Sequence, residues 1–382
     1  MKILHIIDSE GLYGAEIMLI TLMQAQKAIG LSPLLVCIGT PESQPKPLEI
    51  EAQQKGLDVR PWEMRPGLNL KSVRALCQFA DENDFSLIHS HGYKGNILLG
   101  LMPFTGRTLP LVATLHGWTW TGKLNRMMLY EWLDTLSLHK VNHVVVVNAH
   151  MLLHHRLRSI PSHKKSVIFN GLNFSSLSPK QKIPISDDVS NFIKNRFTIV
   201  AVGRLSPEKG FSLLIEAVAD LIHDEQDIQL LILGEGNLRD SLTAQANTLG
   251  ISCRVMMPGY VTSVLPYLQR CQLFAMPSLT EGLPMALLEA MFVKIPIVAS
   301  RVGGIPSALL DGDAGLLIDS GDKEALTHSI RIIYSQPQSF AEMVQRAQTH
   351  ALTEFTAQRM AEGYLDIYEQ VVRSKTSTTS TS

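Results

Sequence analysis

Short apolar runs alternate with amphipathic stretches along the whole chain. Most of these runs are continuous, which is typical of parallel strands that are covered by helices on both faces. In the first half the predicted strands are Ile3–Ile7, Leu34–Ile38, Leu87–His89, Leu111–Leu115, Val144–Val147 and Val167–Phe169. In the second half they are Thr198–Val202, Gln229–Leu233, Arg254–Met257, Leu273–Met276, Pro296–Ala299 and Gly315–Ile318. This alternation predicts an α/β fold with parallel sheets.

Helical periodicity fills most of the gaps between these runs, most clearly in Glu16–Ile29, Ser72–Glu82, Ser212–Asp224 and Leu238–Thr248. A polar, proline-containing segment without clear periodicity, residues 175–190, follows Asn170-Gly171, and a new series begins at Phe197. We therefore expect two Rossmann-like domains, residues 1–175 and 176–354, which face each other across a ligand-binding cleft. A helix at about 355–372 is expected to pack back on the first domain, and residues 373–382 to form a disordered tail.

Composition narrows the class of protein. A chain of 382 residues with 45% hydrophobic residues can build two large cores. Its net charge of −1 creates no general attraction to nucleic acid. The apolar runs are shorter than the ~18 residues of a membrane span, and Asp8 interrupts the first run too early for a signal peptide. The four cysteines form no CxxC pair, so we expect reduced, mostly buried thiols in a cytoplasmic protein.

One candidate site segment is Gly203–Gly210, which reads GRLSPEKG between a predicted strand and a predicted helix. Arg204 and Lys209 come from a single loop at the carboxyl end of the strand. A guanidinium clamps phosphate oxygens with two hydrogen bonds, a lysine adds a mobile charge, and the helix N-terminus also favours anions. A solvated turn whose charges pair with Glu208 is the open alternative.

A second segment, Glu281–Glu289 (EGLPMALLE), places two carboxylates eight positions apart across a predicted helix start. Pro284 suits a first helical turn, which predicts a helix from about Pro284 to Phe292. Glu281 then lies near free backbone N–H groups that can hold a sugar hydroxyl or a phosphate. Glu289 lies within an apolar helix, where an acid is rarely buried without a partner. A capping acid plus a surface glutamate is the open alternative.

Together these segments resemble the retaining glycosyltransferases of family 4, also described as glycosyl transferases group 1, which have the GT-B fold. That family pairs Gly-Arg-Leu-x-x-x-Lys-Gly with Glu-x7-Glu, matched here by Gly203–Gly210 and Glu281–Glu289 in the right order. Further family features are matched by Asn170-Gly171, Gly234–Gly236 and Gly303–Pro306. The resemblance covers nearly the whole chain, and it implies two Rossmann-like domains.

The resemblance also implies roles for individual residues. Arg204 and Lys209 are expected to bind the donor diphosphate, and Glu289 is expected to bind the ribose. Glu281 and the backbone that follows it are expected to hold the donor sugar. The implied catalytic residues are Arg204, Lys209, His116 and Glu281. The implied donor-binding residues are Gly14, Gly203, Gly234, Gly259, Tyr260, Gly282, Leu283, Pro284, Met285 and Glu289. Among these, the segment Gly259-Tyr260-Val261 is expected near the base.

Signals in the first domain are weaker. Gly11–Glu16 reads GLYGAE, where the family has Gly-Gly-Ala-Glu, so Gly14 is the position carried over, and a plain strand–helix turn remains open. His116 comes at a predicted strand end, where the family commonly has a histidine, and the resemblance implies that it lies near the anomeric carbon. His89 and His91 are expected to shape the acceptor side or to hydrogen-bond locally. A zinc site of these three histidines is disfavoured, because no cysteine or acid completes it at ligand spacing.

Other cofactor chemistries fit poorly. Asp311-Gly-Asp313 resembles the metal motif of another glycosyltransferase fold, but its position predicts a turn, so we expect no essential metal. Arg239 occupies the place of the third glycine of a dinucleotide fingerprint, which disfavours NAD. No lysine lies in a context that suits pyridoxal phosphate. Double displacement needs a carboxylate nucleophile and none stands out, so the family's front-face substitution is expected, with the cations stabilising the leaving diphosphate.

The expected function is transfer of a hexose-type sugar from a nucleotide-sugar to a glycan or lipid-linked acceptor in polysaccharide or lipopolysaccharide assembly. UDP is the commoner nucleotide in the family, and GDP stays open. The alternatives are a non-catalytic nucleotide-sugar-binding subunit and a nucleotide-sugar epimerase. Apolar and basic residues mix in Lys123–Lys140, and basic clusters follow at His154–Arg158 and His163–Lys165. They suit peripheral docking on the inner membrane leaflet, and an ordinary solvated helix face is the alternative.

Overall fold

The computed structural model describes residues 1–8, 11–40, 44–65, 69–101, 107–117, 126–174 and 185–379. The chain divides into two compact units, here called unit 1 (Met1–Asn173 with Thr356–Ser382) and unit 2 (Phe174–Phe355). The segment by which the chain leaves unit 1 and the segment by which it returns are hydrogen-bonded to each other. The Ala357 N–H donates to the Leu172 carbonyl at 2.9 Å. A Cβ at Gly171 would meet the backbone of Thr356 there, which explains the glycine of the Asn-Gly pair.

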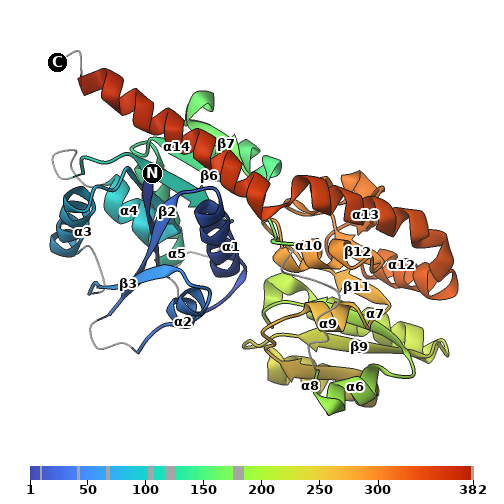
Figure 1. Ribbon diagram of the computed structural model, residues 1–382. Helices are drawn as coiled ribbons and strands as arrows, with labels where there is room; N and C mark the ends of the chain where they lie inside the picture. Colours follow the sequence, from blue (N-terminus) through green and yellow to red (C-terminus); the bar gives the residue numbers. More distant parts are fainter. Residues whose placement is uncertain are drawn as a thin grey trace. The chain divides into compact units, whose positions relative to one another are not determined.

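Unit 1 is built on a seven-stranded parallel sheet with the order β3-β2-β1-β4-β5-β6-β7 (Figure 1). Its strands are β1 Lys2–Ile7, β2 Ser32–Gly39, β3 Asp58–Glu63, β4 Leu87–His91, β5 Leu111–Leu115, β6 His143–Val146 and β7 Lys165–Val167. Its helices are α1 Gly14–Ala28, α2 Pro47–Gln54, α3 Leu70–Glu82, α4 Tyr93–Gly100, α5 Arg126–Leu138 and α14 Ala357–Thr379, with 3-10 turns η1 Ala149–Leu153, η2 His155–Leu157 and η3 Ser162–Lys164. The strand order reverses between β1 and β4, the switch point where such sheets bind ligands.

Unit 2 is built on a six-stranded parallel sheet with the order β10-β9-β8-β11-β12-β13. Its strands are β8 Phe197–Val202, β9 Ile228–Leu233, β10 Val255–Gly259, β11 Leu273–Met276, β12 Ile297–Ser300 and β13 Leu316–Ile318. Its helices are α6 Asp187–Ile193, α7 Phe211–His223, α8 Arg239–Thr248, α9 Leu265–Leu268, α10 Met285–Phe292, α11 Ile305–Ala308, α12 Lys323–Ser335 and α13 Ala341–Glu354, with 3-10 turns η4 Pro207–Lys209, η5 Ser252–Arg254, η6 Leu310–Gly312 and η7 Pro337–Phe340. Here the switch point lies between β8 and β11.

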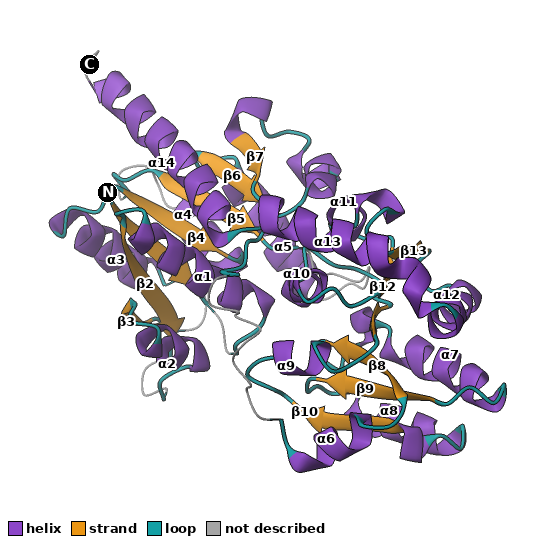
Figure 2. Cartoon of the chain, turned by 45° about the vertical axis from the view of Figure 1, so that its right-hand side comes forward, coloured by secondary structure: helices purple, strands orange, loops and turns teal. Residues whose placement is uncertain are grey.

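Helices cover both faces of each sheet (Figure 2). In unit 1 one face packs on α3, α4 and α5 through a core that includes Leu4, Ile88 and Ala113. On the other face α1 packs on β1 and β2, and α14 lies against α1 (Figure 1). The helix expected at about 355–372 is therefore α14, and it extends to Thr379, into the segment for which the sequence predicts a disordered tail.

Each predicted strand overlaps an observed one, but the sequence missed β3 (DVRPWE). This strand lies at the edge of the sheet and is mostly exposed, so it lacks the apolar run that marked the others. Pro61 is tolerated there because an edge strand has one unpaired side. The predicted α10 is confirmed, with Pro284 as the residue that precedes its first turn. The irregular segment expected at 175–190 lies outside the described residues up to position 184, and α6 begins at Asp187.

Within the described residues no helix is both long enough and apolar enough to cross a membrane. The four cysteines are unpaired: Cys37, Cys77 and Cys271 are buried, whereas Cys253 is exposed. Burial raises the pKa of Cys37 and Cys271 to about 12. These buried thiols are therefore poor nucleophiles near neutral pH.

Candidate active site

The loop after β8 carries two of the predicted cations. Its backbone is held from both sides, because Leu205 donates its N–H to the Glu235 carbonyl at 2.9 Å and Leu279 donates to the Glu208 carbonyl at 2.8 Å. The loop ends at Gly210, whose φ of +67° suits glycine. These hydrogen bonds fix the backbone of a charged loop at the switch point of unit 2.

Lys209 and Glu281 form an ion pair across that switch point. The Lys209 Nζ donates to Glu281 Oε1 at 2.6 Å, and the Ser278 hydroxyl donates to the same oxygen at 2.7 Å. The side chains are only 20% and 9% exposed, so the pair is shielded from water. The structure thus joins a cation from the β8 loop to a carboxylate from the β11 loop. The sequence did not single out Ser278, since one serine after a short strand is a weak signal.

Arg204 is exposed and lies near Glu208 in the same loop. Glu208 accepts a hydrogen bond from the Ser206 hydroxyl at 2.6 Å. Burial tends to raise the pKa of Glu208, but this hydrogen bond, its own N–H and the charges of Arg204 and Lys209 together lower it. The alternative interpretation was a turn in which the charges of the loop pair with Glu208. It holds only in part, because the Lys209 ammonium hydrogen-bonds Glu281 instead.

Two glycines allow the β9 loop to pack directly on the β8 loop. A Cβ at Gly234 would meet the Gly203 carbonyl oxygen, and one at Gly236 would meet that of Leu205. Arg239, in the place of a third glycine, clamps this turn: its Nη2 binds Glu235 Oε1 at 2.6 Å and its Nη1 donates to the Met257 carbonyl at 2.9 Å. The arrangement explains why a dinucleotide fingerprint does not fit.

The backbone after Glu281 is supported by the turn that follows β12. A Cβ at Gly303 would meet the Glu281 carbonyl oxygen, and Gly304 donates its N–H to the Gly282 carbonyl at 2.7 Å. The side chains of Leu283 and Met285 are buried. What this segment can offer a ligand is therefore its backbone, including N–H groups in the first turn of α10 that have no acceptor within the helix.

Glu289 lies in α10 and is partly buried. Among the described residues its carboxylate makes no hydrogen bond or ion pair. Burial raises the pKa of Glu289 to about 7, because the ionised form loses hydration without gaining a partner. An acid in this state is suited to accept hydrogen bonds from ligand hydroxyls.

Gly259 ends β10 and accepts a hydrogen bond from the Gly234 N–H at 2.9 Å. The next residue, Tyr260, is 51% exposed. The segment predicted to lie near the base is therefore attached to the two glycine-rich loops, and it presents an aromatic side chain to solvent.

In unit 1, Gly14 is the first residue of α1, and a Cβ at this position would meet no atom of the described residues beyond its own helix and chain neighbours within 4 Å. The preceding residue, Tyr13, donates its N–H to Glu16 Oε2 at 2.9 Å, so Glu16 satisfies an N–H group at the helix start. The Gly11–Glu16 segment is thus a capped strand–helix turn, and the described part of the chain leaves Gly14 uncovered.

His116 directly follows β5, and burial lowers its pKa to about 4. Its Nε2 is buried and has no hydrogen-bond partner within the described part of the chain. His89 and His91 lie in β4, and both hydrogen-bond side chains of neighbouring strands: His89 Nε2 lies 2.7 Å from Thr114 Oγ1, and His91 Nε2 lies 3.0 Å from His5 Nδ1. The other role expected for them, shaping the acceptor side, stays a prediction.

One ring nitrogen from each of His5, His89 and His91 lies within 4.8 Å of the other two, a spacing that could suit a metal ion. Both nitrogens of His5 and both of His89 already make hydrogen bonds to protein groups. A metal would have to break several of these bonds. We therefore interpret the cluster as a hydrogen-bond network.

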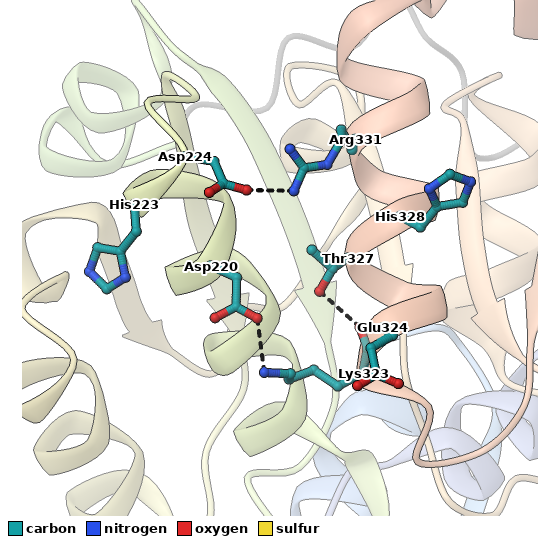
Figure 3. Close-up of a pocket in the computed structure, with 8 residues that line it drawn as sticks. All are labelled: Asp220, His223, Asp224, Lys323, Glu324, Thr327, His328 and Arg331. Carbon is teal, nitrogen blue, oxygen red and sulfur yellow. Dashed lines mark hydrogen bonds and ion pairs between the residues drawn. The ribbon is translucent and has the colours of Figure 1, made fainter.

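A charged surface pocket lies between α7 and α12 (Figure 3). Its opposite charges pair with each other, Lys323 with Asp220 at 2.9 Å and Arg331 with Asp224 at 2.6 Å. The residues that line it are Asp220, His223, Asp224, Lys323, Glu324, Thr327, His328 and Arg331. None of them belongs to the predicted site, so this pocket is separate from the residues described above.

Comparisons with known proteins agree with this geometry. The family described as Glycosyltransferase Family 4 matches residues 13–176, and the family described as Glycosyl transferases group 1 matches residues 183–350. The first match contains most of the unit 1 sheet, and the second contains the whole unit 2 sheet with the Gly203–Gly210 and Glu281–Glu289 segments.

Individual relatives belong to the same class. The chain is 24% identical over 269 residues to the UDP-Gal:alpha-D-GlcNAc-diphosphoundecaprenol alpha-1,3-galactosyltransferase of Escherichia coli, a match covering 69% of this chain and 70% of that enzyme. It is 31% identical over 169 residues to the lipopolysaccharide core biosynthesis glycosyltransferase LpsE of Rhizobium meliloti (strain 1021), covering 44% of this chain and 48% of LpsE.

The fold matches that of Anabaena HepE in its crystal structure with UDP-glucose, with a TM-score of 0.83 at 21% identity, covering 97% of this chain and 100% of HepE. These matches confirm the resemblance drawn from the sequence motifs. The chain therefore belongs to the glycosyltransferases of family 4 and group 1, has the GT-B fold, and is a hexosyltransferase.

Proposed function

We propose that this enzyme transfers a hexose from a UDP-sugar, with retention of configuration, to a glycan or lipid-linked acceptor. The observation that carries the proposal is the shielded Lys209–Glu281 pair at the switch point, with Arg204 in the same loop and Glu289 in α10, whose carboxylate has no partner among the residues that the structure describes. Such a set offers cations for a diphosphate and carboxylates for sugar hydroxyls. The UDP-galactose named for the Escherichia coli relative and the UDP-glucose bound to HepE support the choice of nucleotide.

In this proposal Arg204 and Lys209 bind the donor diphosphate and stabilise the charge that develops on it as it leaves. When the donor enters, Lys209 exchanges its bond to Glu281 for a phosphate oxygen. Glu281 is then released to hold the transferred hexose, and Glu289 accepts hydrogen bonds from the ribose. The existing ion pair keeps both charges compensated until the donor arrives.

Retention without a protein nucleophile is the proposed stereochemical course. Within residues 1–8 and 11–40 of the structure, two acids lie beside the Gly11–Gly14 loop and both are engaged: Asp8 pairs with Lys94 at 2.9 Å and with Lys46 at 3.4 Å, and Glu16 caps α1. Neither is placed as a free carboxylate nucleophile for double displacement. The leaving diphosphate itself would then assist deprotonation of the acceptor, which places the catalytic demand on Arg204 and Lys209.

We also propose that no metal ion or other cofactor is needed. The aspartates that resemble a metal motif lie in the turn around η6, where Asp311 has a φ of +53° and its carboxylate is 3.6 Å from Arg301. Activity that persists in EDTA would support a metal-independent transfer, and a requirement for an added divalent ion would contradict it.

The acceptor proposal includes contact with an anionic membrane. In α5 the apolar side chains of Leu129, Trp132 and Leu136 are 55%, 58% and 41% exposed, and their spacing places them on one helix face. The cluster at His154–Arg158 adds basic residues in unit 1. Lys123, the start of the predicted docking segment, lies outside the described residues. A lipid-linked acceptor is named for the Escherichia coli relative.

Vesicle co-sedimentation tests that contact. Vesicles rich in anionic lipid should retain the protein, and neutral vesicles should not. Trp132→Ala should weaken retention without lowering the melting temperature, because the side chain is mostly exposed. Equal recovery with both vesicle types would remove the membrane from the proposal.

A thermal-shift panel of nucleotide-sugars tests the donor. UDP-glucose, UDP-galactose and GDP-mannose at equal concentration should separate, with a UDP-sugar raising the melting temperature most, since a ligand that binds the folded state stabilises it. Lys209→Ala should abolish the shift. Lys323→Ala removes the same charge from the separate α7–α12 pocket and should leave the shift intact. A larger shift with GDP-mannose would contradict UDP as the donor nucleotide.

A further inference from the structure

A buried hydrogen-bond network lies on the face of the unit 1 sheet that α1 and α14 cover. It joins side chains from β1, β4, β5, α1 and α14, and each is at most 2% exposed. Its members are His5, Gln26, His89, His91, Thr114, Tyr364 and Tyr368. The network runs to the switch point, because His91 is the last residue of β4.

The amide of Gln26 gives the network a direction. Its Nε2 donates to the Tyr368 hydroxyl at 3.1 Å, and its Oε1 lies 2.8 Å from His5 Nε2, which must therefore carry a proton. Burial lowers the pKa of His5 to about 4 and holds that of His91 well below its ordinary value, so both rings are neutral near pH 7. A neutral imidazole has one N–H, which leaves His5 Nδ1 as an acceptor.

The same logic assigns the His91 tautomer. His91 Nε2 lies 3.0 Å from the bare His5 Nδ1 and must donate to it. His91 Nδ1 is then a lone-pair acceptor, and within the described residues it is buried without a partner. An unpaired buried acceptor is unfavourable unless something binds it.

A second buried nitrogen lies nearby. The His91 and His116 rings are stacked with 5.7 Å between their centroids, and His116 Nε2 also lacks a partner among the described residues. Both residues lie at carboxyl ends of neighbouring strands, the edge at which sheets of this kind bind ligands.

We propose that His91 Nδ1 accepts a hydrogen bond from a sugar hydroxyl of the substrate, and that Gln26 and His5 are positioning residues that fix the tautomer required for this. The inference rests on the proposed function for the identity of the ligand. The tautomer assignment itself depends only on the network and on the neutrality of its buried rings.

Nitrogen NMR of the full-length enzyme labelled with ¹⁵N-histidine tests the assignment directly. In the free enzyme His91 should show a protonated Nε2 and a bare Nδ1, identified by the signals lost in His91→Asn. His5→Phe removes the acceptor for the His91 N–H and should leave a mixture of the two His91 tautomers. A protonated Nδ1 in the wild-type enzyme would overturn the proposal, because it corresponds to the opposite orientation of the Gln26 amide.

A matched pair of variants separates substrate binding from a structural role. His91→Asn keeps an acceptor close to the Nδ1 position, whereas His91→Gln keeps a donor close to Nε2, toward His5. We expect His91→Gln to lower kcat/KM about tenfold or more and His91→Asn to lower it less, since loss of one hydrogen bond to a hydroxyl has about this effect. A structural role predicts the reverse order, with the melting temperature following the activity, and that result would overturn the proposal.

Titrations of the labelled enzyme identify the source of the hydroxyl. UDP-glucose, but not UDP, should move the His91 Nδ1 signal if the hexose supplies it, and a short-chain GlcNAc-diphosphate lipid should move it if the acceptor does. A donor that binds by thermal shift while no probe moves the signal would overturn the proposal. If no nucleotide-sugar binds, the proposed function is contradicted instead. The tautomer assignment is decided separately, by the NMR spectrum of the free enzyme.

Discussion

The Glu289 carboxylate has a pKa of about 7 in the folded protein, above its ordinary value of 4.5. Between these values the folded protein keeps a proton that the unfolded chain has released, so stability falls as pH rises through this window. Glu289→Gln should therefore be more stable than the wild type at pH 8, by about 1–3 kcal/mol, and equal to it below about pH 4.5. Urea unfolding at both pH values measures the difference.

The same substitution should weaken donor binding at pH 8, because an amide accepts ribose hydroxyls less well than a carboxylate. Glu324→Gln makes the same chemical change at an exposed position in α12 and should alter neither property. If Glu289→Gln bound the donor normally, the ribose contact would be wrong. If it gave no stability gain at pH 8, the carboxylate would not be poorly solvated in the folded enzyme.

Single residues of the candidate site in unit 2 could be selected from the sequence because each lies in a motif with fixed spacing. Their pairing was not, since Lys209 and Glu281 are 72 positions apart and only the adjacency of β8 and β11 brings them together. Ser278 was missed for the same reason: its importance comes from the oxygen it binds, and nothing in the surrounding sequence marks it.

Tyr368 joins α14 to the rest of unit 1. Its hydroxyl accepts from Gln26 and lies 2.7 Å from His89 Nδ1, so Tyr368→Phe leaves two buried polar groups unpaired. We expect a loss of about 1–3 kcal/mol, with faster amide exchange in α14. Tyr364→Phe is the matched control, because within the network and the described residues that hydroxyl hydrogen-bonds only Thr114, 2.9 Å away, and a smaller loss is expected.

Equal stability of Tyr368→Phe and the wild type would show that the network does not hold α14 in place. Hydrogen exchange of α14, followed by mass spectrometry, distinguishes local release of the helix from global destabilisation.

Strands could be predicted where they are buried, because a buried strand has a continuous apolar run in the sequence. β3 was missed because an exposed edge strand carries no such run. The predicted strand Leu87–His89 is two residues shorter than β4, which continues through the polar Ser90 and His91. The two histidines are tolerated in β4 because their hydrogen-bond partners come from other elements: His89 binds Thr114 in β5 and Tyr368 in α14, and His91 binds His5 in β1. Tyr368 is 279 positions from His89. No local sequence pattern predicts a hydrogen-bond partner so far away along the chain.

The two units should respond oppositely to mild acid. Burial lowers the pKa of His5, His89, His91 and His116 in unit 1, so below about pH 6.5 the unfolded chain binds protons that folded unit 1 does not. Unit 1 therefore loses stability as pH falls from about 6.5 toward 4, by up to about 1.4 kcal/mol per pH unit for each histidine. In unit 2 Glu289 adds stability as pH falls from about 7 to 4.5.

Hydrogen exchange at pH 7 and pH 5, corrected for intrinsic rates, measures both units in one experiment. Unit 1 should lose protection at pH 5, while unit 2 keeps or gains it. Loss of protection in unit 2 before unit 1 would contradict the assignment of the buried histidines as neutral groups.

For the molecule as a whole, the central claim is that the two cations of the β8 loop stabilise the leaving diphosphate during hexose transfer. Turnover of a UDP-sugar at saturating donor tests it most directly, in the wild type, Arg204→Ala and Lys209→Ala, with Lys323→Ala as the charge-matched control. We predict that kcat falls by roughly 10²–10³-fold in each of the first two variants and is unchanged in the control. A near-normal kcat for Arg204→Ala and Lys209→Ala at saturating donor would contradict it.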